Sequence, residues 1–294
     1  MLYKIAVLAS AAFIGAMVLS CRGGQREGTV GADEIDTAMT VGDDRPAMPP
    51  REVMELIDAV THNDARRFAS AVSYPLARPY PLRDVDDSVK MAIYYRVMVD
   101  DSLRNVLRNS QAEEWSRNGW RGWTLADGQY LWIDEKLYEL NYVSVTEKAM
   151  LNTLANEEIV SLQPEMRKGW RPEFCLHGVD NGAIYRVDSR SVADGDSVSP
   201  YRLAIYERGT SLRGHPSASM RGHLDMEGSA GMRTYMFHGR DGSRAYYVCD
   251  RLSDDELPQI VIVSAAGDSA AYRVERAYWR DYIGARHDSV PRER

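Results

Sequence analysis

The six histidines of this chain are the side chains best suited to bind a transition metal. None has the spacing to another histidine that a zinc site usually shows, although His215, His223 and His238 fall in one region of the C-terminal half. These three residues are therefore candidate ligands, and the alternative is that they are solvated side chains of strands and loops. We favour the alternative, and we expect neither a metal site nor another cofactor.

Four acidic residues form a second group that could attract a cation, namely Asp250, Asp254, Asp255 and Glu256. A solvated acidic loop is the alternative interpretation of these residues, and we favour it. The chain contains no phosphate-binding glycine loop, no nucleophile elbow and no His-Glu-x-x-His zinc motif. The sequence therefore favours a protein without catalytic activity over an enzyme.

Cys21 is the residue with the clearest predicted chemistry. Met1–Lys4 carries one positive charge, Ile5–Leu19 is apolar or small throughout, and Ser20 precedes the cysteine. This pattern predicts a signal peptide over residues 1–20, because its core is shorter than the roughly 20 apolar residues that a membrane span needs. The run from Val18 to Cys21 resembles the lipobox of bacterial lipoproteins. The resemblance implies that Cys21 is acylated and becomes the new N-terminus; the alternative is an ordinary signal peptide with an incidental cysteine.

Residues 21–48 are predicted to be a flexible spacer. The segment from Arg22 to Met48 is rich in Gly, Asp, Glu, Thr and Ala and has no aromatic residue, so it cannot bury enough apolar surface to fold. In bacterial lipoproteins an Asp after the cysteine often implies retention in the inner membrane. Arg22 stands at that position here, which favours the outer membrane. The expected location is thus the cell envelope, with the protein attached to a membrane through its lipid anchor and facing either the periplasm or the surface.

Asp-Ser/Thr followed by an apolar residue or Thr occurs six times, beginning with Asp36-Thr37-Ala38. The pattern resembles the O-glycosylation sequon of some anaerobic Gram-negative bacteria. Thr37 is the best candidate, because it lies in the predicted spacer. The alternative, which we favour, is that Asp and Ser recur at helix caps and turns.

Cys175 and Cys249 remain if lipid modifies Cys21. An even pair of cysteines in a compartment that permits disulfides could form a bond. Two buried free thiols acting as small apolar groups are the alternative, and we favour it slightly.

The elements that must position these residues divide by periodicity into two predicted domains, residues 49–168 and 169–284, before a disordered tail over 285–294. In the first domain, Val53, Leu56, Ile57 and Val60 predict a helix. Asn63-Asp64 predicts the cap of a short second helix. Asp86-Asp87-Ser88 predicts the start of a longer helix that carries Val89, Ile93, Val97, Leu103 and Leu107 and bends near Asp100-Asp101. Residues 146–160 are predicted to be helical again.

A three-stranded meander follows the longer helix and contains most of the tryptophans in this domain. Asp127-Gly128 predicts a two-residue turn, which pairs Leu125 with Tyr130 and Trp123 with Trp132. A second turn at residues 134–136 pairs Trp132 with Tyr138. Alternation then places the aromatic residues on one face, turned toward the helices: Trp123, Tyr130, Trp132 and Tyr138.

This order of helices, a break at Ser73-Tyr74-Pro75, a long helix and a meander resembles the α+β cone of ketosteroid-isomerase-like proteins over residues 50–145. The resemblance implies a pocket between sheet and helices, and the four aromatic residues are the candidate lining. It also implies a catalytic carboxylate beside a donor tyrosine, for which Asp100, Asp127 and Asp134 are the acids near the mouth. A filled core on the same face is the alternative, and we favour it.

The second domain changes to a period of two. Eight strands are predicted, separated by Gly-rich turns, and they indicate an antiparallel barrel or sandwich with a layout similar to a small lipocalin-like barrel. The strands cover residues 174–177, 183–188, 201–206, 219–226, 233–238, 245–249, 259–263 and 271–276. The fold class is therefore α+β, with a helix-plus-meander domain followed by an antiparallel β domain.

The net charge of −7 and the lack of a Lys/Arg run argue against nucleic acid as a partner. Two functions from different classes remain. The first, which we favour, is a lipid-anchored, non-catalytic module of the cell envelope that binds another envelope protein or an apolar or sugar-like ligand. The second is a cone-type isomerase or hydrolase with an acid–base pair. A third hypothesis, a barrel that inhibits an extracellular enzyme, has no supporting motif.

Overall fold

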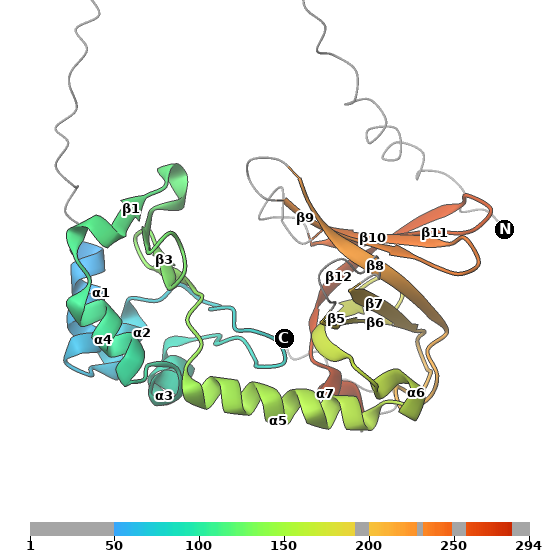
Figure 1. Cartoon of the computed structure of the whole chain (residues 1–294), viewed down its shortest axis with the longest axis horizontal. Helices are drawn as coiled ribbons and strands as arrows, with labels where there is room; N and C mark the ends of the chain where they lie inside the picture. The colour runs from blue at the N-terminus through green and yellow to red at the C-terminus, as the bar shows by residue number, and fades with distance from the viewer. Residues whose placement is uncertain (1–49, 192–199, 228–231, 249–256, 284–294) are drawn as a thin grey trace, which may run out of the picture. The chain divides into compact units, whose positions relative to one another are not determined.

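The computed structural model describes residues 50–191, 200–227, 232–248 and 257–283, and its elements are labelled in Figure 1. Helices and a small sheet come first along the chain, and a closed β-barrel follows. None of the helices in these ranges is both long enough and apolar enough to cross a membrane. Cys21, the predicted acylation site, and Thr37, the candidate glycosylation site, lie outside the described residues.

Four helices open the described chain: α1 (Arg51–Thr61), α2 (Ala65–Ser70), α3 (Ser88–Met98) and α4 (Asp101–Asn109). Asp64 caps α2 by accepting hydrogen bonds from the backbone amides of Arg66 and Arg67, as its place in the sequence predicts. The predicted bent helix is in fact two helices. Asp100 ends the first one because its carboxylate accepts a hydrogen bond from the amide of Leu103 and so caps α4.

The buried face of α3 also differs from the prediction. Met91, Tyr95 and Met98 are buried, whereas Val89 and Ile93 are 70% and 77% exposed. The helix therefore shows its smaller β-branched residues to solvent and packs its longer side chains inward. Val89 and Ile93 are thus two exposed apolar residues one turn apart on α3.

The meander is a sheet of four short strands in sequential order: β1 (Trp115–Arg117), β2 (Trp123–Leu125), β3 (Leu131–Ile133) and β4 (Leu137–Leu140). Short 3-10 helices, η1 (Ala112–Glu114) and η2 (Gly119–Arg121), flank β1. One core joins α1–α4 to this sheet, and its members from the sheet are mainly aliphatic: Leu125, Leu131, Ile133, Leu137 and Leu140.

Helix α5 (Val145–Ser161) follows the meander and packs against both α3 and the first barrel strand. Ser144 and Glu147 form a capping box at its N-terminus. Two short helices, α6 (Pro164–Arg167) and α7 (Trp279–Ile283), pack against α5.

The second part of the chain is an eight-stranded antiparallel barrel, closed by pairing of its last strand with its first. The prediction of eight strands with Gly-rich turns is confirmed, and closure decides between barrel and sandwich. The strands are β5 (Arg171–Gly178), β6 (Ile184–Ser189), β7 (Tyr201–Tyr206), β8 (Ala218–Glu227), β9 (Met232–His238), β10 (Arg244–Val248), β11 (Gln259–Val263) and β12 (Ser269–Ala277).

Alternation along the barrel strands creates two separate cores. One cluster contains Tyr185, Val187, Leu203, Phe237 and Ala245, whose neighbours in each strand point to the other face. The second cluster joins residues of the opposite parity in β5–β7 to α5, α6 and α7, including Cys175, Ile184, Tyr206, Leu162 and Trp279. These helices thus cover one side of the barrel wall.

Candidate functional site

The four aromatic residues predicted to line one face of the meander are divided by the observed register. Trp123 pairs with Ile133, whereas Trp132 pairs with Thr124. Trp123 and Tyr130 are half-buried and pack against the helical core. Since its neighbours Leu131 and Ile133 are buried in that core, Trp132 points to the opposite face. The prediction that all four turn toward the helices is therefore wrong.

The cause is a turn one residue longer than predicted. Leu125 pairs with Leu131, so five residues connect β2 to β3, and Ala126, Asp127 and Gly128 all have positive φ angles. A shift by one residue exchanges the two faces of a strand. The indole of Trp132 then lies over the turn: a Cβ at Gly128 would stand 2.7 Å from its Nε1 atom.

Tyr138 differs from its predicted position for a related reason. Trp132 pairs with Glu139 and Ile133 pairs with Leu137, so Tyr138 is the extra residue of a β-bulge. Its hydroxyl donates a hydrogen bond to the carbonyl of Arg121 at 2.7 Å. The predicted pairing of Trp132 with Tyr138 is thus also wrong.

Among the acids expected near the cone mouth, Asp100 does lie beside a tyrosine. The hydroxyl of Tyr142 donates to its Oδ1 atom at 2.6 Å, and the amide of Val145 donates to Oδ2 at 3.2 Å. Burial raises the pKa of Asp100, but these hydrogen bonds outweigh it and hold the pKa below its usual value. A general base of the ketosteroid-isomerase type needs the opposite shift, so Asp100 acts as a helix cap. Asp127 and Asp134 lie in turns, as predicted.

The histidines of the barrel region do not converge. The rings of His223 and His238 stack at 6.2 Å, while the Nδ1 atom of His215 lies 2.9 Å from a carboxylate oxygen of Glu165. Within the described ranges, no group of three His, Cys, Asp or Glu side chains could hold a metal ion. The acidic group from Asp250 to Glu256 lies outside those ranges.

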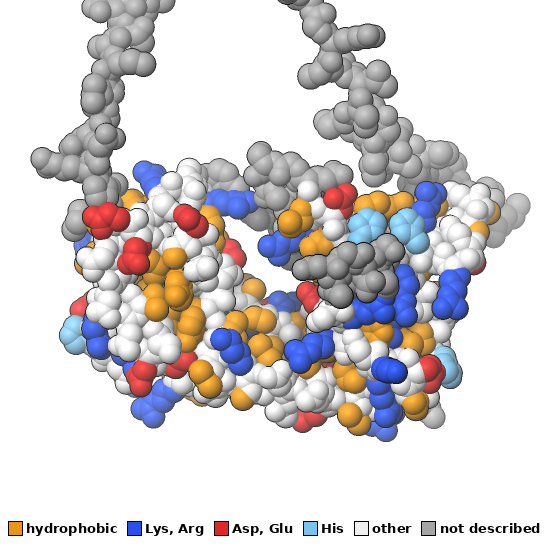
Figure 2. Space-filling model, viewed as in Figure 1, with side chains coloured by type: hydrophobic (Ala, Val, Ile, Leu, Met, Phe, Trp, Pro, Cys, Tyr) orange, Lys and Arg blue, Asp and Glu red, His pale blue; other side chains and the backbone are white. Residues whose placement is uncertain are grey.

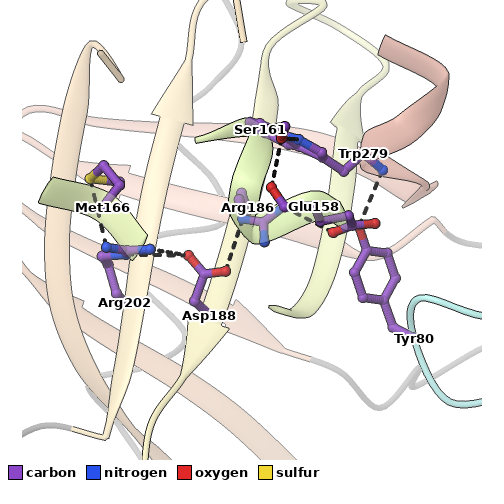
Figure 3. Close-up of polar contacts among 8 residues, drawn as sticks. All are labelled: Tyr80, Glu158, Ser161, Met166, Arg186, Asp188, Arg202 and Trp279. Atoms are coloured by element: carbon purple, nitrogen blue, oxygen red, sulfur yellow. Dashed lines mark hydrogen bonds and ion pairs between the residues drawn. The ribbon is translucent and has the colours of Figure 1, made fainter. Parts of the chain in front are cut away.

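A chain of buried charges crosses the interface between the barrel wall and the helices that cover it (Figure 3). Glu158 of α5 pairs with Arg186 of β6 at 3.0 Å, and Arg186 pairs with Asp188 at 2.8 Å. Asp188 in turn pairs with Arg202 of β7 at 2.5 Å. Two acids and two guanidinium groups alternate, so the chain is electrically balanced.

Aromatic side chains complete this interface. The hydroxyl of Tyr80 donates to Glu158 at 2.9 Å and accepts from the amide of Trp279. The indole of Trp279 donates to Ser161 at 2.8 Å, and Arg186 lies over its ring at 4.6 Å. Burial raises the pKa of Glu158, in spite of the opposing effect of Arg186.

The exposed fractions of Glu158, Arg186 and Asp188 are all 0%. A substrate cannot reach groups that are closed to solvent, so this network joins α5, the Tyr80 segment and the barrel rather than performing chemistry. A second buried pair, Arg78 and Glu147, joins the other end of α5 to the helical part, with the two guanidinium–carboxylate contacts at 2.9 and 2.7 Å.

A concave surface with a largely apolar lining lies between α3, α5 and the segment 82–86. We call it the α3–α5 groove, and its volume is about 410 Å³. Its apolar lining consists of Leu82, Val85, Ile93, Tyr94, Met150 and Leu154, and its charged lining of Arg83, Asp84, Asp86, Lys90 and Arg280.

The charged residues at the rim of the α3–α5 groove are largely paired. Lys90 contacts Asp86 at 2.6 Å, Arg83 pairs with Asp281, and Asp84 contacts Arg276 at 3.0 Å. The apolar part is partly open, because Ile93 is exposed, whereas Leu82 and Val85, which also line the groove, are buried. Sequence reasoning missed this groove, since it assigned Ile93 to the buried side of its helix.

Cys175 is a free thiol and is completely buried, and burial raises its pKa well above the usual value. A thiol held in its neutral form is a poor nucleophile and behaves as a small apolar group. Its predicted disulfide partner, Cys249, lies outside the described residues.

The comparisons with known proteins give no identity. No protein-family model matches the chain, and no curated protein or solved structure matches it either. The function therefore has to be inferred from the site itself.

Proposed function

We propose that this protein is a lipid-anchored, non-catalytic binding module of the cell envelope, and that the α3–α5 groove holds its ligand. The observation that carries the proposal is an open apolar groove of about 410 Å³ with Ile93 exposed at its edge. Ligand sites are usually concave, largely apolar and about 300–1,000 Å³ in volume. Clustered exposed apolar side chains also mark binding surfaces on soluble domains.

The lining points to an apolar ligand of small-molecule size. The side chains of Leu82, Val85, Met150 and Leu154 offer no hydrogen-bonding group. The charged residues at the rim form ion pairs, either with one another or with residues outside the groove. Burial of apolar surface would supply the binding free energy, at roughly 25 cal/mol per Å² before the cost of association. A neutral apolar compound, or the apolar part of a larger molecule, fits these walls best.

The contrast with the enzymatic alternative supports a binding role. The carboxylate nearest to a donor tyrosine, Asp100, has a lowered pKa and caps α4. Glu158 has a raised pKa but is closed to solvent. Neither of these carboxylates lines the α3–α5 groove.

The anchor is the second part of the proposal and rests on the sequence. The charged start, the short apolar core and Ser20 before Cys21 favour acylation of Cys21. The segment up to Met48 then serves as the spacer between the membrane and the folded part. Mass spectrometry of membrane fractions should detect an acylated peptide that begins at Cys21, and Cys21→Ser should release the protein. An unmodified soluble form with another N-terminus would contradict the anchor.

The cone-like interpretation of the N-terminal part is also a proposal. It is supported by a single core that joins α1–α4 to the four-stranded sheet. The short strands and the outward position of Trp132 leave less of a lined interior than the resemblance implies. We therefore place the ligand in the α3–α5 groove and not among the aromatic residues of the meander.

The structure offers a matched pair of variants to test the groove. Ile93 and Val89 are both exposed, both on α3 and one turn apart, but only Ile93 lines the groove. Binding of the neutral apolar dye N-phenyl-1-naphthylamine can be measured by its fluorescence. Ile93→Asp should weaken binding at least tenfold, because a carboxylate replaces part of the apolar wall, whereas Val89→Asp should leave it within twofold.

Both variants change exposed residues, so the fold should survive, and thermal melts verify this. Equal loss in the two variants would mean that the dye binds the general surface of α3. Saturable binding that both variants retain would place the ligand elsewhere. Either result would overturn the groove as the ligand site.

A further inference from the structure

Basic side chains gather on the outer wall of the barrel, away from the α3–α5 groove lining. The strand registers place Asp188, Arg202, Arg221, His238 and Arg244 directly opposite one another across β6–β10. Their neighbours Val187, Leu203 and Phe237 belong to the core inside the barrel, the one that contains Tyr185 and Ala245, so the row of side chains faces outward. Figure 2 shows basic and histidine side chains near one another on the barrel.

Three arginines of this wall contact the ring of Trp170. The guanidinium carbons of Arg221, Arg202 and Arg190 lie 4.3, 4.7 and 5.1 Å from the centre of its ring. Trp170 itself is only 7% exposed, which fixes the ring as a platform. We call Arg190, Arg202, Arg221 and Arg240 the Trp170 arginine cluster, because Arg240 also acts electrostatically on Arg221.

Among the described residues, three of the four arginines of the cluster have no neutralising carboxylate. Arg202 is the exception, because it pairs with Asp188 at the end of the balanced chain of buried charges. In the described part of the chain, no carboxylate forms an ion pair with Arg190, Arg221 or Arg240, and the Nε atom of Arg190 is buried without a hydrogen-bond partner. Burial and the neighbouring arginines together lower the pKa of Arg221.

Like charges directly opposite each other on a sheet destabilise it. Arg202 and Arg221 are such a pair. Asp188 neutralises Arg202, whereas Arg221 is exposed and its guanidinium group lies over Trp170. An anion bound at the exposed guanidinium group of Arg221 would reduce this repulsion. Guanidinium groups bind phosphate and sulfate oxygens in a bidentate manner, which suits a site that presents several of them.

We propose that the Trp170 arginine cluster binds an oxyanion, a phosphate or a sulfate group. This site is separate from the α3–α5 groove. It would bind its ligand through charged guanidinium groups, whereas the groove would bind its ligand through apolar surface. The group is either the free ion or part of a larger molecule such as an anionic lipid headgroup, and the arms of the test distinguish these two sources.

The test compares the full chain with Arg221→Gln and with Arg66→Gln, a matched loss of charge at an exposed arginine of α2. Titration calorimetry at low ionic strength measures binding of inorganic phosphate and sulfate. Sedimentation measures binding to phosphatidylglycerol vesicles and to phosphatidylcholine vesicles. Thermal melts verify folding, and Arg221→Gln should melt no lower than the wild type, because one of two repelling charges is removed.

Binding of the free ions that Arg221→Gln weakens at least tenfold, and that Arg66→Gln preserves, would support the free ion as the source. Binding only to phosphatidylglycerol vesicles with the same dependence on Arg221 would support a headgroup. The proposal is overturned if neither probe binds, or if the two variants behave alike. A lower melting temperature of Arg221→Gln, with loss of native structure, would show that the cluster is a packing feature instead.

Discussion

The strongest test of the meander register is a comparison of two neighbouring residues of β3. Ile133 is completely buried in the core of the helical part, whereas Trp132 is half-buried on the opposite face. Ile133→Ala removes three carbon groups, each worth about 0.8 kcal/mol of burial, and the cavity left behind adds to the loss. We expect the free energy of unfolding to fall by about 3–4 kcal/mol.

Trp132→Ala should cost much less despite the larger side chain, about 1 kcal/mol, because the indole lies over the Gly128 turn and not in the core. Urea unfolding followed by far-ultraviolet circular dichroism suits both variants, since it does not depend on tryptophan fluorescence. The dependence on urea should keep its slope while the midpoint moves. For a folded part of this size, Ile133→Ala should lower the melting temperature by about 7–14 °C. A loss for Trp132→Ala that equals or exceeds that of Ile133→Ala would refute the register and restore an inward tryptophan.

Three further predictions follow from buried and charged groups. Arg186→Met leaves Glu158 and Asp188 buried without their shared partner and should lower the free energy of unfolding in urea by about 3–5 kcal/mol. The control Arg273→Met breaks the exposed pair with Asp180 and should change this free energy little. Equal losses in the two variants would contradict a structural role for the chain of buried charges. The pKa of Asp100 is lower in the folded state, so the stabilisation by its carboxylate is present above about pH 4 and is lost as the pH falls through the folded pKa. Asp100→Asn should therefore lose less stability than the wild type on acidification. The same dependence of the free energy of unfolding on pH in wild type and variant would argue against the lowered pKa. In a Cys21→Ser/Cys249→Ser variant, the buried thiol of Cys175 should react with Ellman's reagent only after unfolding, and fast reaction in native buffer would contradict its burial.

The barrel strands were predictable because each one carries its own signal. In Tyr201–Tyr206, Tyr201, Leu203 and Ile205 alternate with other residues, and Gln259–Val263 is a short run of β-branched apolar residues. Turn residues bound both strands, so local pattern alone locates them. Closure was not predictable in the same way. It depends on the pairing of β12 with β5, residues that lie about a hundred positions apart, and nothing in either strand specifies that partner.

In the meander, the turn signal at Asp127-Gly128 was correct, but the register predicted from it assigned Trp132 to the wrong face of the sheet. Asp127-Gly128 does lie in a turn, but positive φ angles begin at Ala126 and lengthen the connection by one residue. Aliphatic side chains then fill the core, and Trp132 and Tyr138 keep their polar atoms near the surface. Large aromatic residues with polar atoms need a partner when buried, whereas Leu and Ile do not.

The buried charges were not predictable from the sequence for a different reason. Glu158 follows Glu157 in a polar helix, and nothing local distinguishes the buried residue from the exposed one. The difference arises only when α5 packs against β6 and brings Glu158 to Arg186. The Trp170 arginine cluster likewise depends on cross-strand registers that only the closed barrel provides.

The central claim, an apolar ligand in the α3–α5 groove, is tested most directly by methyl NMR of methionine-labelled protein during a titration with N-phenyl-1-naphthylamine. Met150 lines the groove, Met226 is 67% exposed on β8, and Met91 is buried in the helical core. The aromatic rings of a bound dye should shift the Met150 methyl signal, identified with a Met150→Leu variant, and the shift should saturate at the affinity measured by fluorescence. The signals of Met226 and Met91 should change little. A Met150 signal that stays in place while the dye binds, or an equal shift at Met226, would contradict the groove as the ligand site.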